Sequence, residues 1–352
     1  MLTRPCTVLL AWAVLQPPAA KPLVYVLSTG GTISGRGDSS TNLTDYRSGS
    51  VTGAQLVAGV PEIASIAEVK VEQIANVSST DIGPAQWLAL AKRIERIFTD
   101  DARASGVVVT HGTNTLEETA YFLNLTVRHD RPVVLVGSMR PSTAISADGP
   151  INLLNGIRTA VAPDARGKGV LVVLNDEINA ARDVTKTNTL RVETFRAPEL
   201  GLLGYVDGDR VSFYRASTRR HTVRSEFDVT NLQRLPTVQI VYSYAGAGTA
   251  PLDAAVASGA DGVVIAGTGN GLVSSEERTV LQRIASMDRA KRPVVVRSAR
   301  VGNGRVTPSG VYDAMDAIAA DNLNPQKARV LLMLALTRTR DVKEIARMFS
   351  EY

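Results

Sequence analysis

The chain is poor in the side chains that build disulfides and metal sites. Its 352 residues include a single cysteine, Cys6, so one chain can form neither a disulfide nor a thiolate metal site. The three histidines, His111, His129 and His221, are far apart in the sequence and lack the spacing of metal ligands. We therefore expect neither a metal ion nor a cofactor in the mechanism.

The sequence also lacks repeats and long runs of similar residues. The chain has no internal repeat, no low-complexity tract and no run of five basic residues, and its net charge of +5 comes from 39 basic and 34 acidic residues. The basic residues between Arg215 and Arg224 are interrupted by polar ones, which is typical of a solvated loop. This charge distribution argues against nucleic acid as the partner.

The first twenty residues differ from the rest of the chain. Arg4 precedes the apolar run 7–15 and then the residues QPPAA, a pattern typical of a secretory signal peptide. The run is too short to span a membrane. We therefore predict a signal peptide at residues 1–20, a periplasmic or secreted mature chain beginning near Lys21, and no membrane association after processing. A buried or disordered N-terminal tail is the alternative.

Hydrophobic residues make up 44% of the sequence, which is enough for two domains with cores of their own. Short runs rich in Val, Ile and Leu recur at 23–27, 69–74, 107–109, 133–136 and 170–174. Between several of them lie segments with helical spacing, as in the apolar face formed by Trp87, Leu88, Ala91, Ile94 and Phe98. Such alternation predicts an α/β fold with a mainly parallel sheet covered by helices on both faces.

This pattern stops at residues 214–236, which are polar and charged and have no clear period. Strand-like runs then resume at 238–241, 263–266 and 294–297, and helices are expected to begin near Pro325 and Val342. We therefore predict a larger N-terminal domain at 21–213, a linker at 214–236, and a smaller C-terminal α/β domain at 237–352.

The stretch VYVLSTGGTISG places Thr32 just beyond a predicted strand. In open parallel sheets, ligands bind beyond the carboxyl ends of the strands, and Gly30 and Gly31 permit close approach of the backbone. The glycine spacing fits neither the dinucleotide fingerprint nor the Walker pattern. A nucleotide-binding module is therefore disfavoured.

A second loop of the same kind is VVVTHGTNTLEE, in which Thr113 follows a predicted strand and precedes a helix. Residues 115–118 have the pattern of a capping box, and a helix N-terminus favours developing negative charge. Two hydroxyl side chains, each placed just after a strand, suggest acyl transfer more than phosphate binding. The alternative is that both are ordinary threonines in turns.

A threonine hydroxyl needs a base or a cationic neighbour before it can attack an amide. His111 is one candidate, although it could simply hydrogen-bond the loop, and no Gly-x-Ser-x-Gly elbow supports a serine triad. Lys186 in RDVTKTNT is the other candidate, because burial could lower its pKa. A surface lysine is the alternative reading of this residue.

Taken together, LSTGGTISG and VVTHGTNTLEETAYFL closely resemble the two signature motifs of bacterial-type L-asparaginases. The likeness continues through PVVLVGSMRPSTAISADGPINLLN, RDVTKTNT and LNPQKARVLLMLALT, and it covers nearly everything from Leu23 to Tyr352. It is nearest to the secreted type II enzymes, with a glutaminase-asparaginase group close by.

The resemblance implies hydrolysis of L-asparagine to L-aspartate and ammonia, with a side activity on L-glutamine. It implies that Thr32 attacks the amide and forms an acyl-enzyme, and that Tyr46 on a lid hydrogen-bonds Thr32. The lid stretch GRGDSSTNLTDYRSGS is rich in glycine and serine, which independently indicates flexibility. Thr113 and Lys186 would relay protons and help to activate water, and backbone N–H groups of both threonine loops would stabilise the oxyanion.

Substrate binding is implied in the same way for Ser79, Thr80, Asn114 and Asn270. Ser79 would hold the α-carboxylate, and Asn270 would come from a neighbouring subunit of a homotetramer with sites between subunits. The sequence departs from the family pattern at Asn114, where Asp is usual, and at Thr80, where Gln or Glu is common. The stretch ARVGNGRVTPSGVYDA contains no match to the Glu that some members contribute from the neighbouring chain.

A different class of protein would suit the same outline. A secreted two-domain protein that binds an amino acid without turning it over would share the signal peptide and the two α/β lobes. Release of ammonia from asparagine separates the two hypotheses. The preference for asparagine or glutamine depends on the fit around one methylene and is left open by the sequence.

Overall fold

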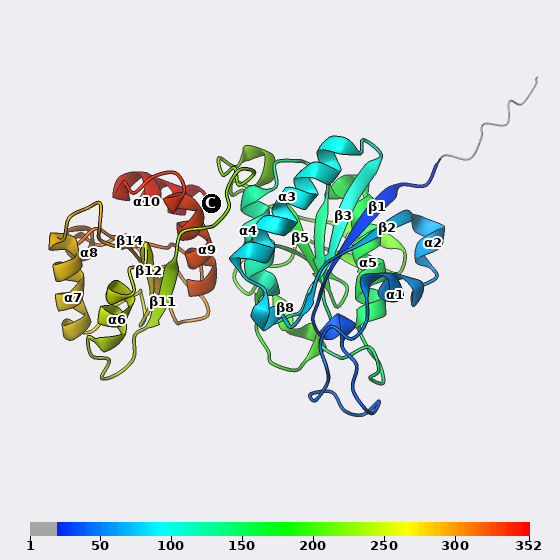
Figure 1. Cartoon of the computed structure of the whole chain (residues 1–352), viewed down its shortest axis with the longest axis horizontal. Coiled ribbons are helices and arrows are strands. Elements are labelled where there is room, and N and C mark those ends of the chain that lie inside the picture. Colours follow the sequence, from blue (N-terminus) through cyan, green and yellow to red (C-terminus); the bar gives the residue numbers. More distant parts are fainter. Residues whose placement is uncertain (1–19) are drawn as a thin grey trace, which may run out of the picture.

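The larger sheet forms the right-hand half of the molecule in Figure 1, in a computed structural model that describes residues 20–352. Its strand order is β10-β9-β6-β5-β4-β3-β1-β2, parallel from β2 to β5 and antiparallel from β5 to β10. The five apolar runs predicted in this half are all strands, and the central ones are buried on both faces. The strands are β1 (Leu23–Gly30), β2 (Glu68–Val77), β3 (Ala104–Thr110), β4 (Val133–Val136), β5 (Val170–Leu174), β6 (Glu177–Ala180), β9 (Gly204–Asp207) and β10 (Arg210–Phe213).

Helices cover both faces of this sheet, which confirms the predicted fold class. Two separate apolar clusters lie on the two faces, one with α3 and α4 and the other with α1, α2 and α5. The predicted apolar face of α3, from Trp87 to Phe98, is buried in the first cluster. The helices are α1 (Gly53–Ala58), α2 (Ile63–Ile66), α3 (Pro84–Asp100), α4 (Leu116–Thr126) and α5 (Gly149–Val161).

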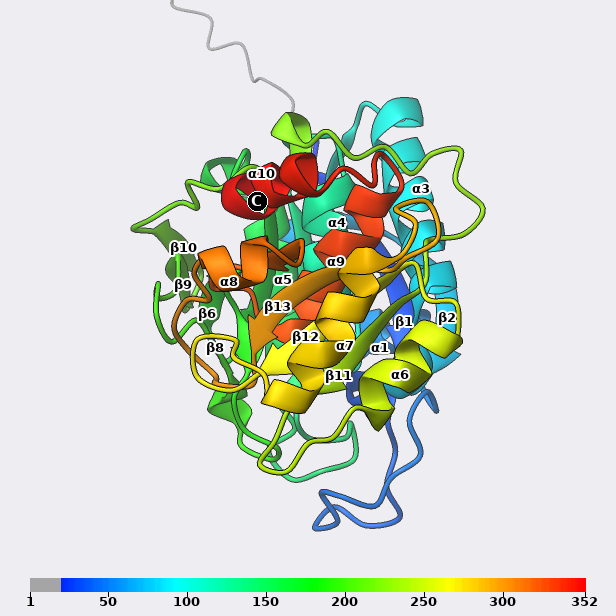
Figure 2. The ribbon, with the colours of Figure 1, turned by 90° about the vertical axis from the view of Figure 1, so that its left-hand side faces the viewer.

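The smaller sheet is fully parallel, in the order β11-β12-β13-β14. Figure 2 views it from the side of α6, α7 and α8, with α9 behind the strands. The helices predicted near Pro325 and Val342 begin at those residues. The elements are β11 (Val238–Tyr242), α6 (Ala250–Ala257), β12 (Gly262–Gly267), α7 (Ser275–Ser286), β13 (Val294–Ala299), α8 (Gly310–Asp313), β14 (Ala317–Ala319), α9 (Pro325–Leu336) and α10 (Val342–Glu351).

None of the helices within residues 20–352 is long and apolar enough to cross a membrane.

Several short elements complete the described part of the chain. The short elements are the 3-10 helices η1 (Thr32–Ser34), η2 (Ser79–Asp81), η3 (Pro163–Ala165), η4 (Val192–Thr194) and η5 (Thr222–Arg224), and the paired strands β7 (Thr185–Lys186) and β8 (Phe195–Arg196).

Helix α9 joins the two halves of the molecule. It packs on β11, β12 and β13 with one side and on α4 with the other, so side chains of both halves share one apolar cluster. The central residues of α9, 330–335, are almost completely buried. The proposed division into domains at 213 and 237 stays a prediction, since the core itself is continuous across α9.

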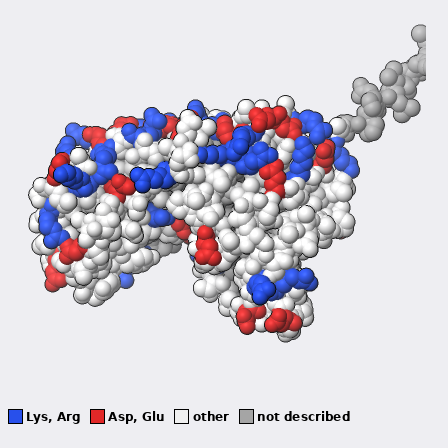
Figure 3. Space-filling view, viewed as in Figure 1, with Lys and Arg blue, Asp and Glu red and all other residues white. Residues whose placement is uncertain are grey.

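The basic stretch between Arg215 and Arg224 is exposed at both of these arginines, as expected of a solvated loop, but Arg219 and Arg220 between them are paired with distant carboxylates. Arg219 lies 2.8 Å from the Asp321 carboxylate, and Arg220 lies 2.6 Å from that of Glu351. The sequence could not show this because both acidic partners lie about a hundred residues away or more. Figure 3 shows basic and acidic side chains mixed along the upper side of the molecule, consistent with such pairing.

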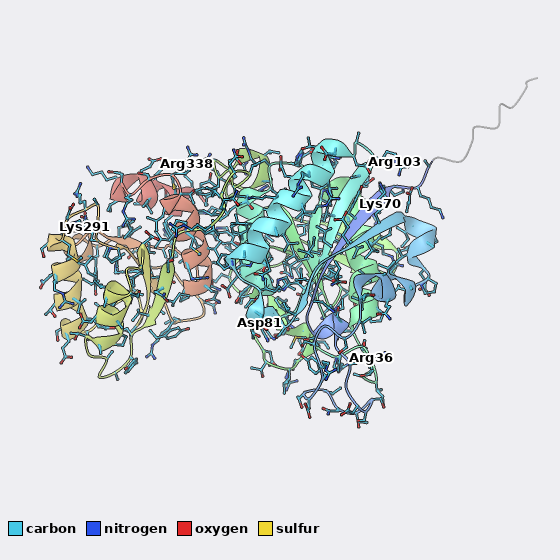
Figure 4. The ribbon with its side chains drawn as sticks, viewed as in Figure 1. Arg36, Lys70, Asp81, Arg103, Lys291 and Arg338 are labelled. Carbon is cyan, nitrogen blue, oxygen red and sulfur yellow. The ribbon has the colours of Figure 1, made fainter. Side chains whose placement is uncertain are left out.

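The carboxyl ends of the parallel strands define one edge of the larger sheet. Figure 4 labels Arg36 and Asp81 at the lower edge of this half, after the ends of β1 and β2. Lys70 and Arg103 lie at the upper edge, near the starts of β2 and β3. The lower edge is therefore where ligands are expected to bind in this fold.

Candidate active site

The two threonine loops lie against each other at this lower edge. β1 and β3 are neighbouring strands, and the Thr29 hydroxyl donates to the Thr110 carbonyl over 2.9 Å. Gly31 has φ of +82°, and a Cβ atom there would lie 2.1 Å from the Cα of Gly112. Only glycine at position 31 allows this approach, so the GG pair is explained by the contact between the loops.

Thr32 is the first residue of η1, directly after β1, and its side chain is 7% exposed. Its Oγ1 lies 2.7 Å from the hydroxyl of Tyr46. Tyr46 belongs to residues 35–50, which we call the lid. The lid is closed at its base by a backbone pair between Arg36 and Arg47.

The lid also rests on the loop between β4 and α5. The backbone N–H of Ser142 donates to the Gly35 carbonyl, and that of Ile145 donates to the Ser40 carbonyl, both over 2.8 Å. A Cβ on Gly35 would lie 2.7 Å from the ring of Tyr46. The position of Tyr46 near Thr32 is therefore set by the contact of its ring with Gly35 and by the hydrogen bonds of the lid to the loop between β4 and α5.

Lys186 reaches the second threonine from β7. Its Nζ lies 2.8 Å from Thr113 Oγ1 and 3.0 Å from Asn114 Oδ1. Burial lowers the pKa of Lys186, and the carboxylate of Glu117 opposes this effect. The structure thus bears out the suggestion that burial lowers the pKa of this lysine.

His111 does not take part in this pair. Trp87 Nε1 donates to Thr119 Oγ1 over 2.8 Å, and this hydroxyl lies 2.9 Å from His111 Nε2. His111 Nδ1 lies 2.7 Å from the Gly112 carbonyl. A neutral ring that donates from Nδ1 and accepts at Nε2 satisfies the whole chain, and burial lowers the pKa of His111 to about 4. The histidine therefore holds the loop by hydrogen bonds, the alternative to a role as base.

The predicted capping box at 115–118 does not form. Thr115 precedes α4, but its side chain makes no capping hydrogen bond. Its Oγ1 donates instead to the Ser79 carbonyl over 2.6 Å. Tertiary contact with η2 outcompetes the local cap here, and it ties the Ser79 loop to the Thr113 loop.

The two residues expected after β2 differ in their placement. Ser79 is buried, and its Oγ accepts from the Asn114 backbone N–H over 3.2 Å. Thr80 is exposed, and its hydroxyl donates to Ser78 Oγ over 2.9 Å. Ser79 therefore belongs to the same cluster as Thr32, Thr113, Asn114 and Lys186. In the part of the chain that the structure describes, no hydrogen bond joins Thr80 to that cluster.

Asn270 lies in the other half of the molecule, in the loop after β12. Its Nδ2 donates to Thr307 Oγ1 over 2.9 Å, and its Oδ1 accepts from the Thr307 N–H over 2.8 Å. Within residues 20–352, no hydrogen bond connects its side chain to the threonine loops. One copy of the chain thus brings together Thr32, Tyr46, Ser79, Thr113, Asn114 and Lys186, but not Asn270.

Two charged side chains behind this cluster escaped the sequence analysis. Glu117 on α4 is 6% exposed, and Lys327 on α9 is 2% exposed. Helical spacing gives no signal for them, because their burial depends on the packing of α4 against α9.

Within residues 20–352, no group of three His, Cys, Asp or Glu side chains is placed to hold a metal ion.

Both halves of the chain match family models of known proteins. Residues 23–219 match the family model described as asparaginase, N-terminal, and residues 237–349 match the glutaminase/asparaginase C-terminal domain. The chain is 52% identical to L-asparaginase 2 of Bacillus subtilis, over 94% of this chain and 87% of that protein. It is 44% identical to a probable periplasmic L-asparaginase of Haemophilus influenzae, over 99% of this chain and 98% of that one.

A solved structure also resembles this chain in both sequence and fold. The crystal structure of a probable cytoplasmic L-asparaginase from Campylobacter jejuni superposes with a TM-score of 0.91 and 45% identity. The match covers 95% of this chain and 100% of that one.

Proposed function

The chain belongs to the asparaginase and glutaminase family of amidohydrolases, and from this we propose that it hydrolyses L-asparagine to L-aspartate and ammonia, with a side activity on L-glutamine. The observation that carries the proposal is that two pairs, each built on a threonine hydroxyl, lie at one edge of the sheet. Thr32 contacts Tyr46 there, and Thr113 contacts Lys186.

In the proposed reaction, Thr32 Oγ1 attacks the side-chain amide carbon of asparagine. The hydroxyl proton is delivered to the leaving nitrogen, ammonia departs, and an aspartyl ester of Thr32 remains. Water then attacks the ester, which releases aspartate and returns the proton to Thr32. Tyr46, 2.7 Å from Thr32 Oγ1, orients the nucleophile before the attack.

Lys186 and Thr113 would carry the proton in both steps. A lysine whose pKa is lowered by burial is more often neutral near pH 7 than a surface lysine. A neutral amine can accept from the Thr113 hydroxyl and still donate to Asn114 Oδ1, so the observed distances fit both protonation states.

The oxyanion would be stabilised by backbone donors. Among the residues that the structure describes, neither the N–H of Thr32 nor that of Thr113 donates a hydrogen bond. Both groups are therefore free for a developing negative charge, and such donors are typically worth about 3–4 kcal/mol each.

Substrate recognition would involve Ser79 for the α-carboxylate and Asn114 for the α-ammonium. Thr80 would lie at the rim, since it is exposed and bonded to Ser78. Asn270 would serve the site of another copy in a homotetramer with sites between subunits, because it is remote from the threonine loops of its own chain.

The proposal includes export of the chain. The predicted signal peptide lies almost entirely outside the described residues. Of the three similar proteins named above, one is called periplasmic and another cytoplasmic. We predict that the mature chain begins near Lys21. The intact mass of the protein exported by its native host measures this, and a mass that retains residues 2–20 would contradict export by cleavage.

Ammonia release tests the proposed activity directly. The purified chain is incubated with L-asparagine, and ammonia and aspartate are measured in parallel, with L-glutamine as the second substrate. Equimolar ammonia and aspartate support the proposal. Saturable binding of asparagine without ammonia would instead identify a binding protein.

We predict that Asn114→Asp raises kcat/KM for L-asparagine about tenfold, since each 1.4 kcal/mol corresponds to a factor of ten. The amide oxygen of Asn114 faces Lys186, and it brings no negative charge to the substrate ammonium. A carboxylate would add this charge, so the gain should appear mainly as a lower KM. The new carboxylate would also pair with Lys186 and raise the pKa of that lysine. The rise of kcat with pH, which reports the loss of a proton from Lys186, should then move to higher pH.

Steady-state kinetics of both proteins over a range of pH check this prediction. Asn231→Asp, on the exposed segment before β11, is the control for an added charge elsewhere. An unchanged or lower kcat/KM in the Asn114 variant would mean that the site is adapted to the amide.

A further inference from the structure

Lys186 is carried by a very short element. β7 has two residues and pairs only with the two residues of β8. Thr187 and Asn188 extend this hairpin by hydrogen bonds to Thr194, but these bonds tie the hairpin only to itself, whereas Nζ of Lys186 must stay within hydrogen-bond distance of Thr113. Other contacts must therefore hold this segment in place.

The buried side chain of Lys327 supplies such contacts. Its Nζ donates to the carbonyl of Arg182 over 2.8 Å and to that of Val184, two residues before Lys186. Burial lowers the pKa of Lys327 to about 8, so the ammonium is costly at this place. An apolar side chain would avoid that cost, but it could not fix two carbonyls of the segment that leads into β7.

The same turn of α9 also holds the helix that follows Thr113. Glu117 lies in the first turn of α4, and its Oε1 accepts from Gln326 Nε2 over 2.8 Å. Asn324 Nδ2 lies 3.5 Å from Glu117 Oε2 and 3.5 Å from the hydroxyl of Thr185. The first residues of α9 and its cap thus contact Glu117, four residues after Thr113, and Val184 and Thr185, which directly precede Lys186.

Charge adds to this geometry. Glu117 on α4 is the charged group that acts on Lys186, and Glu117, Asp183 and Arg182 act on Lys327. Arg182 and Asp183 lie 3.2 Å apart as an ion pair, whereas no carboxylate lies within ion-pair distance of Lys186 or Lys327 in the described residues. The Glu117 carboxylate opposes the effect of burial on both lysines.

We propose that Asn324, Gln326, Lys327 and Glu117 form a positioning cluster that fixes Lys186 against Thr113 and, through the charge of Glu117, sets the pH at which Lys186 becomes neutral. The proposal rests on the function proposed above. It gives the C-terminal half a role in the catalytic pair of its own chain, separate from the role of Asn270 in another copy.

The first test replaces Lys327 with methionine, which fills the same space without an ammonium. We expect kcat to fall about tenfold or more with little change in KM, because the substrate contacts remain while Lys186 loses its fixed position. Lys327→Gln keeps one donor for a carbonyl and should recover part of the loss. Lys92→Met is the control, since Lys92 also donates to a backbone carbonyl, that of Leu232, but far from the site.

The second test is Glu117→Gln. Loss of the carboxylate should lower the pKa of Lys186 and move the rising limb of kcat to lower pH, by about half a pH unit or more. Glu118→Gln is the control for the loss of a carboxyl from the same turn: Glu118 faces Arg329 at 3.8 Å, and burial raises its pKa to about 7, so its replacement should not cause this shift. The pKa of Lys186 is also measured directly, by NMR of the protein labelled at lysine Cε.

The outcomes separate the two proposals. If the unmodified chain releases no ammonia, the proposed function fails, and the NMR titration still tests the cluster. If Lys327→Met lowers only the melting temperature, the lysine is merely structural and its positioning role is overturned. If Glu117→Gln leaves the pKa of Lys186 unchanged, or shifts it no more than Glu118→Gln does, the role of the Glu117 charge is overturned.

Discussion

Replacement of Thr32 by alanine should lower kcat for L-asparagine by about three orders of magnitude or more, with the fold unchanged. The hydroxyl is the atom that forms the acyl-enzyme in the proposed reaction, and no other hydroxyl is bonded to Tyr46 in the described structure. The stability should change little, because the lost hydrogen bond to Tyr46 contributes only about 1 kcal/mol.

Steady-state kinetics and thermal unfolding of the same preparation measure both expectations. Thr32→Ser keeps a nucleophile and should retain far more activity than the alanine variant. Thr41→Ala is the matched control, since Thr41 is an exposed lid residue whose hydroxyl contacts only Ser39. Near-normal turnover of Thr32→Ala would remove Thr32 from its role.

Replacement of Lys186 by methionine should lower kcat by about two to four orders of magnitude, the range expected when a general base is lost. Methionine can occupy the half-buried space of the lysine stem, so a folded protein is expected. In the proposed reaction the rising limb of the pH profile of kcat reports the loss of a proton from Lys186, so this limb should disappear in the variant. If the lysine serves the water step, the aspartyl ester of Thr32 should accumulate.

Mass spectrometry of the variant mixed with L-asparagine detects that ester, and a pH series of kcat tests the missing limb. Lys168→Met is the control, because Lys168 packs over the ring of Phe213 on the surface of the same sheet. A variant of Lys186 that keeps the rate and the pH profile of the parent would show that another group acts as the base.

The sequence by itself determined the layers of the fold. The apolar runs became strands because strands covered on both faces of a sheet are continuously apolar. The face from Trp87 to Phe98 became buried because a helix repeats every 3.6 residues, which places these apolar residues on one side. It also placed Thr32 and Thr113 at the ends of strands β1 and β3, since glycines and a helix start follow each run.

Only the tertiary structure decided which side chains meet at those ends. Lys186 meets Thr113 from 73 residues away, and Tyr46 meets Thr32 by way of a folded lid. It also overruled two local expectations, since Thr115 bonds Ser79 in place of a cap and Arg219 and Arg220 are paired with acidic residues. A polar side chain takes the partner that packing brings within about 3 Å, and this choice depends on distant segments. For the same reason the burial of Glu117 and Lys327 behind the site followed from the packing of α9 on α4, and no local pattern contains it.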